Sequence, residues 1–111
     1  MTHDEAVFAL GALAQDTRLM VFRHLVQAGA AGAAAGEIAR ALSVPHNTLS
    51  THLAQLSRAN LLDAHKEGRS VIYRVRQSGA KALLSYLLED CCQGNRAKCC
   101  EALDSTLTNC C

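Results

Sequence analysis

Hydrophobic residues recur at helical spacing near the middle of the chain, in residues 43–62. Leu49, Leu53 and Leu56 stand at positions i, i+4 and i+7, so they lie on one face of a helix. The other faces carry short hydroxyls and amides, and no acidic residue occurs in this stretch. Such a pattern is also typical of an ordinary amphipathic surface helix. It predicts a helix that is held by one face and leaves a polar face free for contacts.

A shorter helical pattern precedes this helix. Residues 36–42 place Ile38 and Leu42 on one face, and Ser43-Val44-Pro45 supplies a turn. Pro45 is expected in the first turn of the second helix, where its missing N–H removes no intrahelical bond. A short helix, a turn and a second helix with polar N-terminal residues form the helix-turn-helix pattern. A second helix without acids can lie against phosphates and base edges, which makes it a predicted recognition helix.

The spacing then changes from helical to alternating. Val71, Tyr73 and Val75 alternate with side chains that include two arginines, and Glu67-Gly68 is the turn signal. Residues 65–75 therefore predict a β-hairpin with Gly68 in the left-handed conformation. Five Arg or Lys residues stand against two acids in residues 58–76, a local net charge of +3. A basic hairpin beside a helix-turn-helix is a wing suited to phosphate or minor-groove contacts.

Eight side chains are candidate contacts to double-stranded operator DNA. Six stand on the predicted recognition helix and two in the hairpin: His46, Asn47, Thr48, Ser50, Thr51, His52, Lys66 and Arg69. His52 lies at the edge of the apolar face, so we interpret it as a partly buried helix histidine on the DNA side rather than a metal ligand.

Two helical patterns and a low-complexity stretch precede the helix-turn-helix. Residues 6–13 place Val7, Leu10 and either Leu13 or Ala14 on one face. Residues 17–27 follow a predicted cap at Asp16-Thr17. Their apolar face is expected to contain the following side chains: Leu19, Phe22 or Arg23, and Val26. Residues 28–36 contain only Ala and Gly, and they predict a flexible connector.

Helical spacing resumes after the hairpin. Gln77-Ser78-Gly79 is expected to break the strand, and residues 80–90 carry a broad stripe of leucines: Leu83, Leu84, Leu87 and Leu88. A chain of 111 residues offers this stripe little surface of its own, so we expect it to pair with a twofold mate, the alternative being that it covers its own core. The predicted fold is mainly α with a small β-hairpin: a dimeric winged helix-turn-helix over residues 1–90, followed by a cysteine-rich segment, residues 91–111.

Composition narrows the class of protein. Half of the residues are hydrophobic and the net charge is +1, so DNA binding has to come from local patches rather than bulk charge. The N-terminus lacks a basic signal region and no apolar stretch is long enough to span a bilayer, which predicts a cytoplasmic protein without a membrane partner. No nucleophile triad, phosphate-binding glycine loop or carboxylate pair occurs, so neither an enzyme nor an organic cofactor is expected.

All six cysteines fall in the last 21 residues, as three adjacent pairs: Cys91-Cys92, Cys99-Cys100 and Cys110-Cys111. A secreted disulfide scaffold would spread its cysteines through the fold, so these are expected to be ligands or redox groups. Trivalent arsenic and antimony are soft ions that three thiolates can satisfy. Cys91 and Cys92 are the predicted first two ligands, and either Cys99 or Cys100 is the third. A four-thiolate zinc site and a dithiol redox switch remain open.

Three stretches resemble the ArsR/SmtB family of winged-helix metalloregulatory repressors. They are LGALAQDTRLMVFRHL, GEIARALSVPHNTLSTHLAQLSRANLL and EGRSVIYRV, and TLSTHLAQLSRANLL is the most specific. The chain departs from the family pattern at three positions. Thr51 stands where Arg or Lys is frequent, Pro45 where a capping Ser is usual, and Asn60 where Gly is usual.

The resemblance implies a homodimeric repressor that leaves its operator when a toxic metal ion or metalloid binds. Residues 33–38 lack the cysteines of one sensing branch, and residues 80–90 lack the histidine of the zinc-sensing branch. Asp90-Cys91-Cys92-Gln93-Gly94 resembles the arsenic-sensing members, which implies As(III) or Sb(III) as the inducer. The resemblance also favours Cys99 as the third ligand, with Cys100 as its alternative. A persulfide or thiol redox signal, or another soft metal (Cd, Pb, Hg or Zn), is the alternative within the same fold. A metal-sequestering protein and a structural adaptor are the alternatives outside it.

Overall fold

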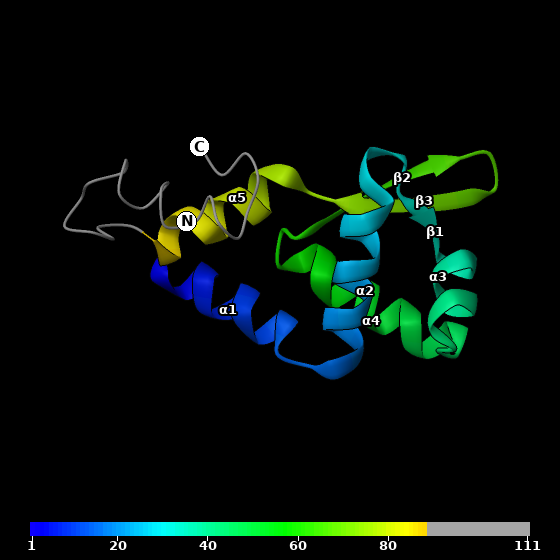
Figure 1. The fold of residues 1–111 in the computed structure, drawn as a ribbon, viewed down its shortest axis with the longest axis horizontal. Helices are drawn as coiled ribbons and strands as arrows, with labels where there is room; N and C mark the ends of the chain where they lie inside the picture. Colours follow the sequence, from blue (N-terminus) through cyan, green and yellow to red (C-terminus); the bar gives the residue numbers. More distant parts are fainter. Residues whose placement is uncertain (89–111) are drawn as a thin grey trace.

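The computed structural model describes residues 1–88, which form five α-helices, one short 3₁₀ helix and a small sheet (Figure 1). In chain order the elements are α1 (His3–Leu13), α2 (Asp16–Ala28), η1 (Gly29–Ala31), β1 (Ala33–Ala34), α3 (Ala35–Leu42), α4 (His46–Arg58), β2 (Leu62–Glu67), β3 (Ser70–Val75) and α5 (Gln77–Leu87). This is a winged helix-turn-helix fold, as predicted. The predicted boundary after residue 90 lies outside the described residues.

The sheet contains the predicted hairpin and one strand that was not predicted. Its order is β1-β3-β2, all antiparallel, and Gly68 has a φ of +64° in the turn between β2 and β3. The hairpin begins at Leu62 rather than at residue 65. The interpretation of residues 28–36 as a flexible connector was wrong, because they form η1, β1 and the start of α3. Gly32 (φ +66°) permits this course, since a Cβ there would overlap with the carbonyl oxygen of Tyr73.

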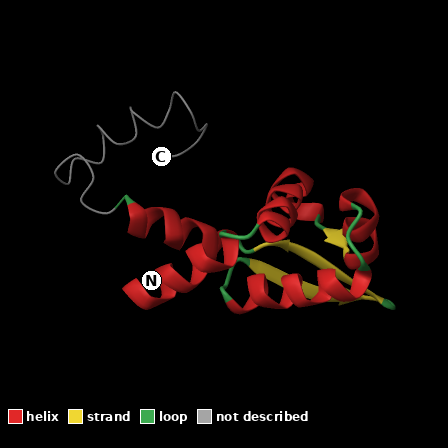
Figure 2. Ribbon diagram, turned by 90° about the horizontal axis from the view of Figure 1, so that it is seen from below, coloured by secondary structure: helices red, strands yellow, loops and turns green. Residues whose placement is uncertain are grey.

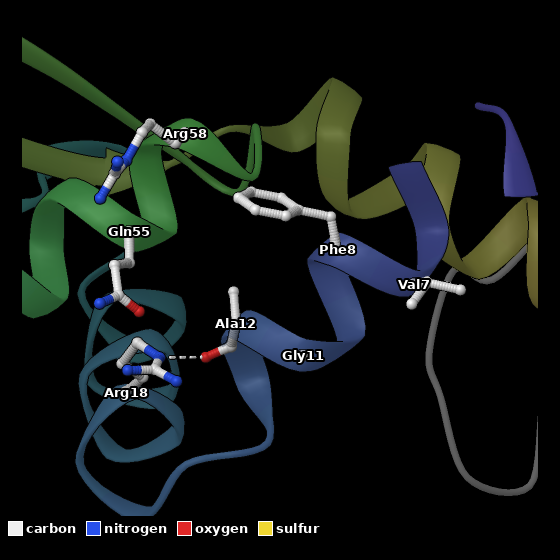
Figure 3. Close-up of a pocket in the computed structure, with 7 residues that line it drawn as sticks. All are labelled: Val7, Phe8, Gly11, Ala12, Arg18, Gln55 and Arg58. Carbon is white, nitrogen blue, oxygen red and sulfur yellow. Dashed lines mark hydrogen bonds between the residues drawn. The ribbon is translucent and has the colours of Figure 1, made fainter. Parts of the chain in front are cut away.

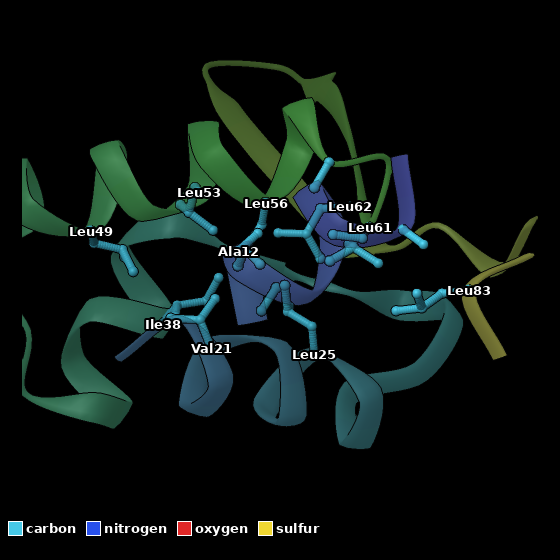
Figure 4. Packing of buried hydrophobic residues seen from close by; sticks show 14 residues of the cluster. Ala12, Val21, Leu25, Ile38, Leu49, Leu53, Leu56, Leu61, Leu62 and Leu83 are labelled. Atoms are coloured by element: carbon cyan, nitrogen blue, oxygen red, sulfur yellow. The ribbon is translucent and has the colours of Figure 1, made fainter. Parts of the chain in front are cut away.

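The core lies between α2, α4 and the strands that follow α4 (Figure 4). Leu49, Leu53 and Leu56 of α4 are buried as predicted. They meet Leu25 of α2 and Ile38 of α3, which are also fully buried. Burying aliphatic side chains of this size stabilises a fold by roughly 1.5–3 kcal/mol each. The polar face of α4 is therefore displayed from a helix whose opposite face is fixed.

The larger apolar side chains that were predicted to share a face of α1 are not the ones that pack into the core. The buried side chains of α1 are the alanines Ala6, Ala9 and Ala12, whereas Val7, Phe8 and Leu10 are exposed. Small side chains let α1 lie close against its neighbours α2 and α4, and the larger apolar residues stay partly exposed outside the core. The helix also begins earlier than predicted, because Thr2 and Glu5 form a capping box.

The details of α2 also differ from the prediction. Gln15, not Asp16-Thr17, caps the helix, and its side-chain oxygen accepts the backbone N–H of Arg18 at 2.8 Å. The buried face contains Val21 and Leu25. Leu19 and Val26, which were expected on the apolar face, are exposed. Leucine and valine occur on both faces of α2, so periodicity alone did not identify the inner one.

The helix α5 begins at Gln77, three residues earlier than predicted. Gly79, which was expected to end the strand, is buried inside the first turn of α5. Leu83 packs into the core, whereas the other leucines of the predicted stripe, Leu84, Leu87 and Leu88, are exposed.

Different elements form the two ends of the fold. The helices α1 and α5 lie side by side at one end, and the β2–β3 hairpin extends from the other (Figures 1 and 2). The hydroxyl of Tyr86 on α5 lies 3.2 Å from Nδ1 of His3 on α1, which joins the two helices. Within residues 1–88 no helix is both long and apolar enough to cross a bilayer.

Candidate nucleic-acid interface

The helix-turn-helix consists of α3, the turn at residues 43–45, and α4. Ser43 adopts a left-handed conformation (φ 55°), and the N–H of Val44 donates to the carbonyl of Ala39 at 3.0 Å. Pro45 was expected in the first turn of α4, but it stands just before the helix, and its carbonyl accepts the N–H of Leu49 at 2.9 Å. The ring of Pro45 thereby fixes where α4 begins without removing an intrahelical bond.

Five of the candidate DNA contacts stand exposed on the N-terminal half of α4: His46, Asn47, Thr48, Ser50 and Thr51. The Ser50 hydroxyl donates to the carbonyl of His46 at 3.1 Å, and the Thr51 hydroxyl lies 3.5 Å from the carbonyl of Asn47. A hydroxyl oxygen keeps two acceptor lone pairs when its proton is used. The surface of α4 can therefore accept hydrogen bonds from base amino groups, and Asn47 adds an amide. No acidic residue lies in the first turn of α4.

His52 lies differently from these five. It is half-buried, and its Nδ1 lies 3.4 Å from a guanidinium nitrogen of Arg18 on α2. Arg18 has only donors, so this contact requires Nδ1 of a neutral imidazole as the acceptor. Burial, and then the positive charge of Arg18, lower the pKa of His52 below its ordinary value. His52 is therefore held as a neutral side chain at the edge of the α4 surface.

Arg18 is a structural residue that sequence reasoning missed. Its Nε donates to the carbonyl of Ala12 on α1 at 2.6 Å, while its other end meets His52 on α4. It lies in a hollow of about 400 Å³ between α1, α2 and α4 (Figure 3). The hollow is lined by Val7, Phe8, Gly11, Ala12, Arg18, Gln55 and Arg58. The only sequence signal for Arg18 was its place in the motif that the family resemblance covers.

The two wing candidates are both exposed. Lys66 lies on β2, and Arg69 follows Gly68 in the hairpin turn. Arg74 on β3 is exposed as well. Arg76 differs, because its Nε donates to the carboxylate of Asp63 at 2.6 Å. The cations available to an external phosphate are therefore those nearer the tip of the hairpin.

The predicted metal ligands, Cys91, Cys92, Cys99 and Cys100, lie outside the described residues, as do Cys110 and Cys111. Among residues 1–88, no three His, Cys, Asp or Glu side chains are grouped so that they could hold a metal ion. The metalloid site stays a prediction from the sequence.

Comparison with known proteins identifies the class first. Residues 13–65 match a family model described as a helix-turn-helix domain. The matched region contains α2, α3 and α4 and the first part of β2, so it covers the whole candidate interface except the hairpin tip. The fold, the exposed face of α4 and this match define a winged helix-turn-helix transcriptional regulator.

Individual relatives identify the family. The transcriptional activator HlyU of Vibrio cholerae is 32% identical over 92 residues, which is 83% of this chain and 82% of HlyU. Solved HlyU has a TM-score of 0.64 at 30% identity, with 84% of this chain and all of HlyU covered, and another structure is described as reduced HlyU. Mb0332 from Mycobacterium bovis, described as homodimeric and as a possible ArsR-family regulator, has a TM-score of 0.64 at 28% identity, covering 78% of this chain and 81% of that one. The chain belongs to the ArsR/HlyU family of winged helix-turn-helix transcriptional regulators.

Proposed function

We propose that this protein is a homodimeric repressor that binds operator DNA through α4 and the wing and releases it when As(III) or Sb(III) binds the C-terminal cysteines. The observation that carries the DNA-binding part is the surface of α4. It displays hydroxyl and amide groups without a carboxylate, on a helix that is fixed by three fully or almost fully buried leucines. A rigid polar helix of this kind suits the major groove.

The wing would add contacts that position the protein without reading sequence. Lys66, Arg69 and Arg74 are exposed on or beside the hairpin. Each phosphate that a lysine or arginine neutralises releases counterions, so affinity should fall steeply as salt rises. The low net charge of the whole chain means that these local cations carry this electrostatic contribution.

A second copy of the chain is the proposed partner for the exposed face of α1 and α5. Six large apolar side chains on these adjacent helices are 37% to 55% exposed: Val7, Phe8, Leu10, Leu84, Leu87 and Leu88. Large exposed apolar patches mark interaction surfaces. Mb0332, a relative of the same fold, is described as homodimeric, which supports this assignment.

The inducer proposal is supported by the sequence that follows α5. Cys91 and Cys92 come four and five residues after the last residue of α5, and Cys99 and Cys100 follow. Adjacent thiols with a third thiol nearby suit a soft trivalent ion. An ion that prefers the released form by about 1–3 kcal/mol would lower operator affinity roughly 5- to 150-fold.

The proposal is tested by titrating arsenite into the protein bound to a labelled duplex from its own promoter and following anisotropy. Release of the wild type is expected. The Cys91→Ser protein should bind DNA and no longer respond, because a hydroxyl is a poor ligand for a soft ion. A protein with both Cys110→Ser and Cys111→Ser should respond almost as the wild type does. Release of Cys91→Ser at the wild-type arsenite concentration would place the site elsewhere.

A thiol redox switch is the second candidate. The adjacent cysteine pairs favour it, because two neighbouring thiols can be oxidised together. One solved structure of the relative HlyU is described as its reduced form. In the same anisotropy experiment, a persulfide donor without arsenite distinguishes the two signals. Release by the persulfide alone would favour the redox switch over the metalloid site.

A further inference from the structure

The C-terminal end of α4 is held by two backbone hydrogen bonds from the residues that follow it. Asn60 follows the helix with a φ of +63°, and its N–H donates to the carbonyl of Ser57 at 3.1 Å. The N–H of Leu61 donates to the carbonyl of Leu56, also at 3.1 Å. These two bonds form a Schellman motif with Asn60 at the left-handed position. Because Leu61 is fully buried, the end of α4 is fixed to the core.

The first residue of the α5 region is bonded to this end of α4. Arg76 is the N-cap residue of α5, and one of its terminal guanidinium nitrogens donates to the side-chain oxygen of Asn60 at 2.9 Å. Its Nε donates to the carboxylate of Asp63 at 2.6 Å, and its backbone N–H donates to the carbonyl of Leu61 at 2.9 Å. Arg76 therefore joins the start of α5 to three residues that follow α4.

A backbone contact reinforces these hydrogen bonds. Gly79 is buried in the first turn of α5, and a Cβ there would overlap with the carbonyl oxygen of Asn60. The backbones of α5 and of the α4 terminus therefore touch directly. A shift of the first turn of α5 has to move Asn60 as well or break these bonds.

The identity of residue 60 is informative in this setting. A φ of +63° suits glycine best, and glycine is usual at this position in the family that the sequence resembles. Asparagine tolerates the left-handed conformation, so the turn can form with either residue. What asparagine adds is the side-chain oxygen that Arg76 binds.

We propose that Asn60 is a positioning residue that links the end of α4 to the start of α5, so that the two helices move together between DNA-binding and released forms. The proposal rests on the proposed function, because α4 is the assigned DNA-reading helix and α5 leads to the assigned sensor cysteines. The Asn60–Arg76 bond and the Gly79 contact carry displacements of α5 to α4. The bond between Asn60 and Arg76 thus connects α4 to α5 of the same chain, and its strength should set how strongly the inducer weakens operator binding.

The test compares the wild type with Asn60→Gly and Asn60→Asp in the full chain. Asn60→Gly keeps the preferred backbone conformation and removes the acceptor, whereas Asn60→Asp keeps an acceptor for Arg76. Asn60→Gly should melt at the same temperature as the wild type or higher. Its operator affinity without inducer should stay within about twofold, and the fold-release by arsenite should shrink roughly 2- to 30-fold. Asn60→Asp should restore the wild-type release. Equal release of wild type and Asn60→Gly would overturn the proposal.

Amide hydrogen exchange gives a readout that needs no inducer. The N–H of Ala80 donates to the carbonyl of Arg76 at 3.0 Å and reports on the first turn of α5. Operator DNA should slow its exchange in the wild type and Asn60→Asp, and clearly less in Asn60→Gly, which keeps the Gly79 contact and the backbone bond from Arg76 to Leu61. Slower exchange in α4 alone, in the wild type, would overturn the proposal.

The same measurement distinguishes a failure of the proposed function. If the wild type binds no duplex, the DNA-binding assignment fails, and exchange in the free proteins still decides the link. Faster exchange of Ala80 in free Asn60→Gly than in free wild type supports the link. Identical exchange overturns it.

Discussion

The side chain of Arg18 on α2 contacts two other helices, α1 and α4. It bonds to Ala12 of α1 from its own helix α2 and reaches His52 of α4. We therefore expect Arg18 to influence DNA binding through the position of α4, without contacting DNA itself. Arg18 and His52 are 34 positions apart along the chain, so only the fold reveals their contact.

The pairing with Arg18 gives a prediction about pH. The pKa of His52 should lie below its ordinary value, because burial and the charge of Arg18 both disfavour the imidazolium. Below about pH 6.5 the imidazole of the unfolded chain takes up a proton that His52 in the folded protein does not, so the free energy of unfolding falls. The contribution of His52 to stability is therefore complete above about pH 6.5 and is lost as the pH falls through the lowered pKa. Titration by NMR should show the low pKa. In Arg18→Gln it should rise only partly, because burial is the larger cause. A pKa of His52 at or above its ordinary value in the wild type would contradict this account.

We expect the wing and α4 to make separable contributions to DNA binding. Arg69→Ala should weaken binding to every sequence and reduce the slope of log affinity against log salt by about one. Lys81→Ala is a matched control, since it removes an exposed charge from α5 rather than from the wing. An unchanged salt slope in Arg69→Ala would remove the wing from the interface.

Thr48→Ala should instead change base preference at one position, by roughly 1–3 kcal/mol.

At the scale of elements, periodicity predicted α4 and the hairpin well because each has one apolar face and one polar face. It did not identify the buried face of α1, which consists of alanines, while the larger apolar residues stay exposed. It also missed β1, because a two-residue strand of alanines leaves no pattern. The start of α5 was missed because Gly79 indicated a break, whereas the carbonyl of Asn60 is what requires glycine there.

Only part of the candidate site could be predicted from the sequence. The exposed residues of α4 and the wing tip could be proposed from side-chain type and spacing alone. The support of His52 by Arg18 depends on tertiary contacts that no local pattern contains.

The close packing of α1 gives a prediction about stability. Ala9 is fully buried, so Ala9→Leu should lower the free energy of unfolding by about 1–3 kcal/mol through overpacking. Gly11→Ala is the control on the same helix, because a Cβ there has no neighbour within 4 Å. It should raise the free energy of unfolding by about 0.4–1 kcal/mol, since alanine restricts the unfolded chain. Chemical denaturation measures both, and a neutral Ala9→Leu would mean that α1 packs more loosely than described.

At the scale of the whole molecule, residues 1–88 have an apolar end and a basic end. The apolar end contains the exposed residues of α1 and α5, and the basic end contains the hairpin. A twofold dimer formed through the apolar end presents two recognition helices. For both to enter the major groove, their spacing should match one helical turn of DNA, about 34–36 Å.

The dimer gives the last prediction. Phe8→Glu and Leu87→Glu should each shift the protein to monomer in sedimentation experiments at micromolar concentration, because each places a charge in the proposed interface. Val26→Glu is the matched control, since Val26 is equally exposed but lies on α2. Operator binding should fall with dimerisation in the two interface variants and not in the control. Full operator binding by a monomeric Phe8→Glu protein would contradict the twofold arrangement.

The two faces of α1 can change independently of each other. The alanine face is constrained by this chain's own core, so few substitutions are tolerated there. The face with Val7, Phe8 and Leu10 contributes little to the core of its own subunit, and its constraints come from whatever binds it. In the proposed dimer, a few substitutions on that face after a gene duplication should prevent mixed assemblies of the two copies. Regulators of this architecture can thus diverge into separate circuits while their fold and their DNA-reading helix stay the same.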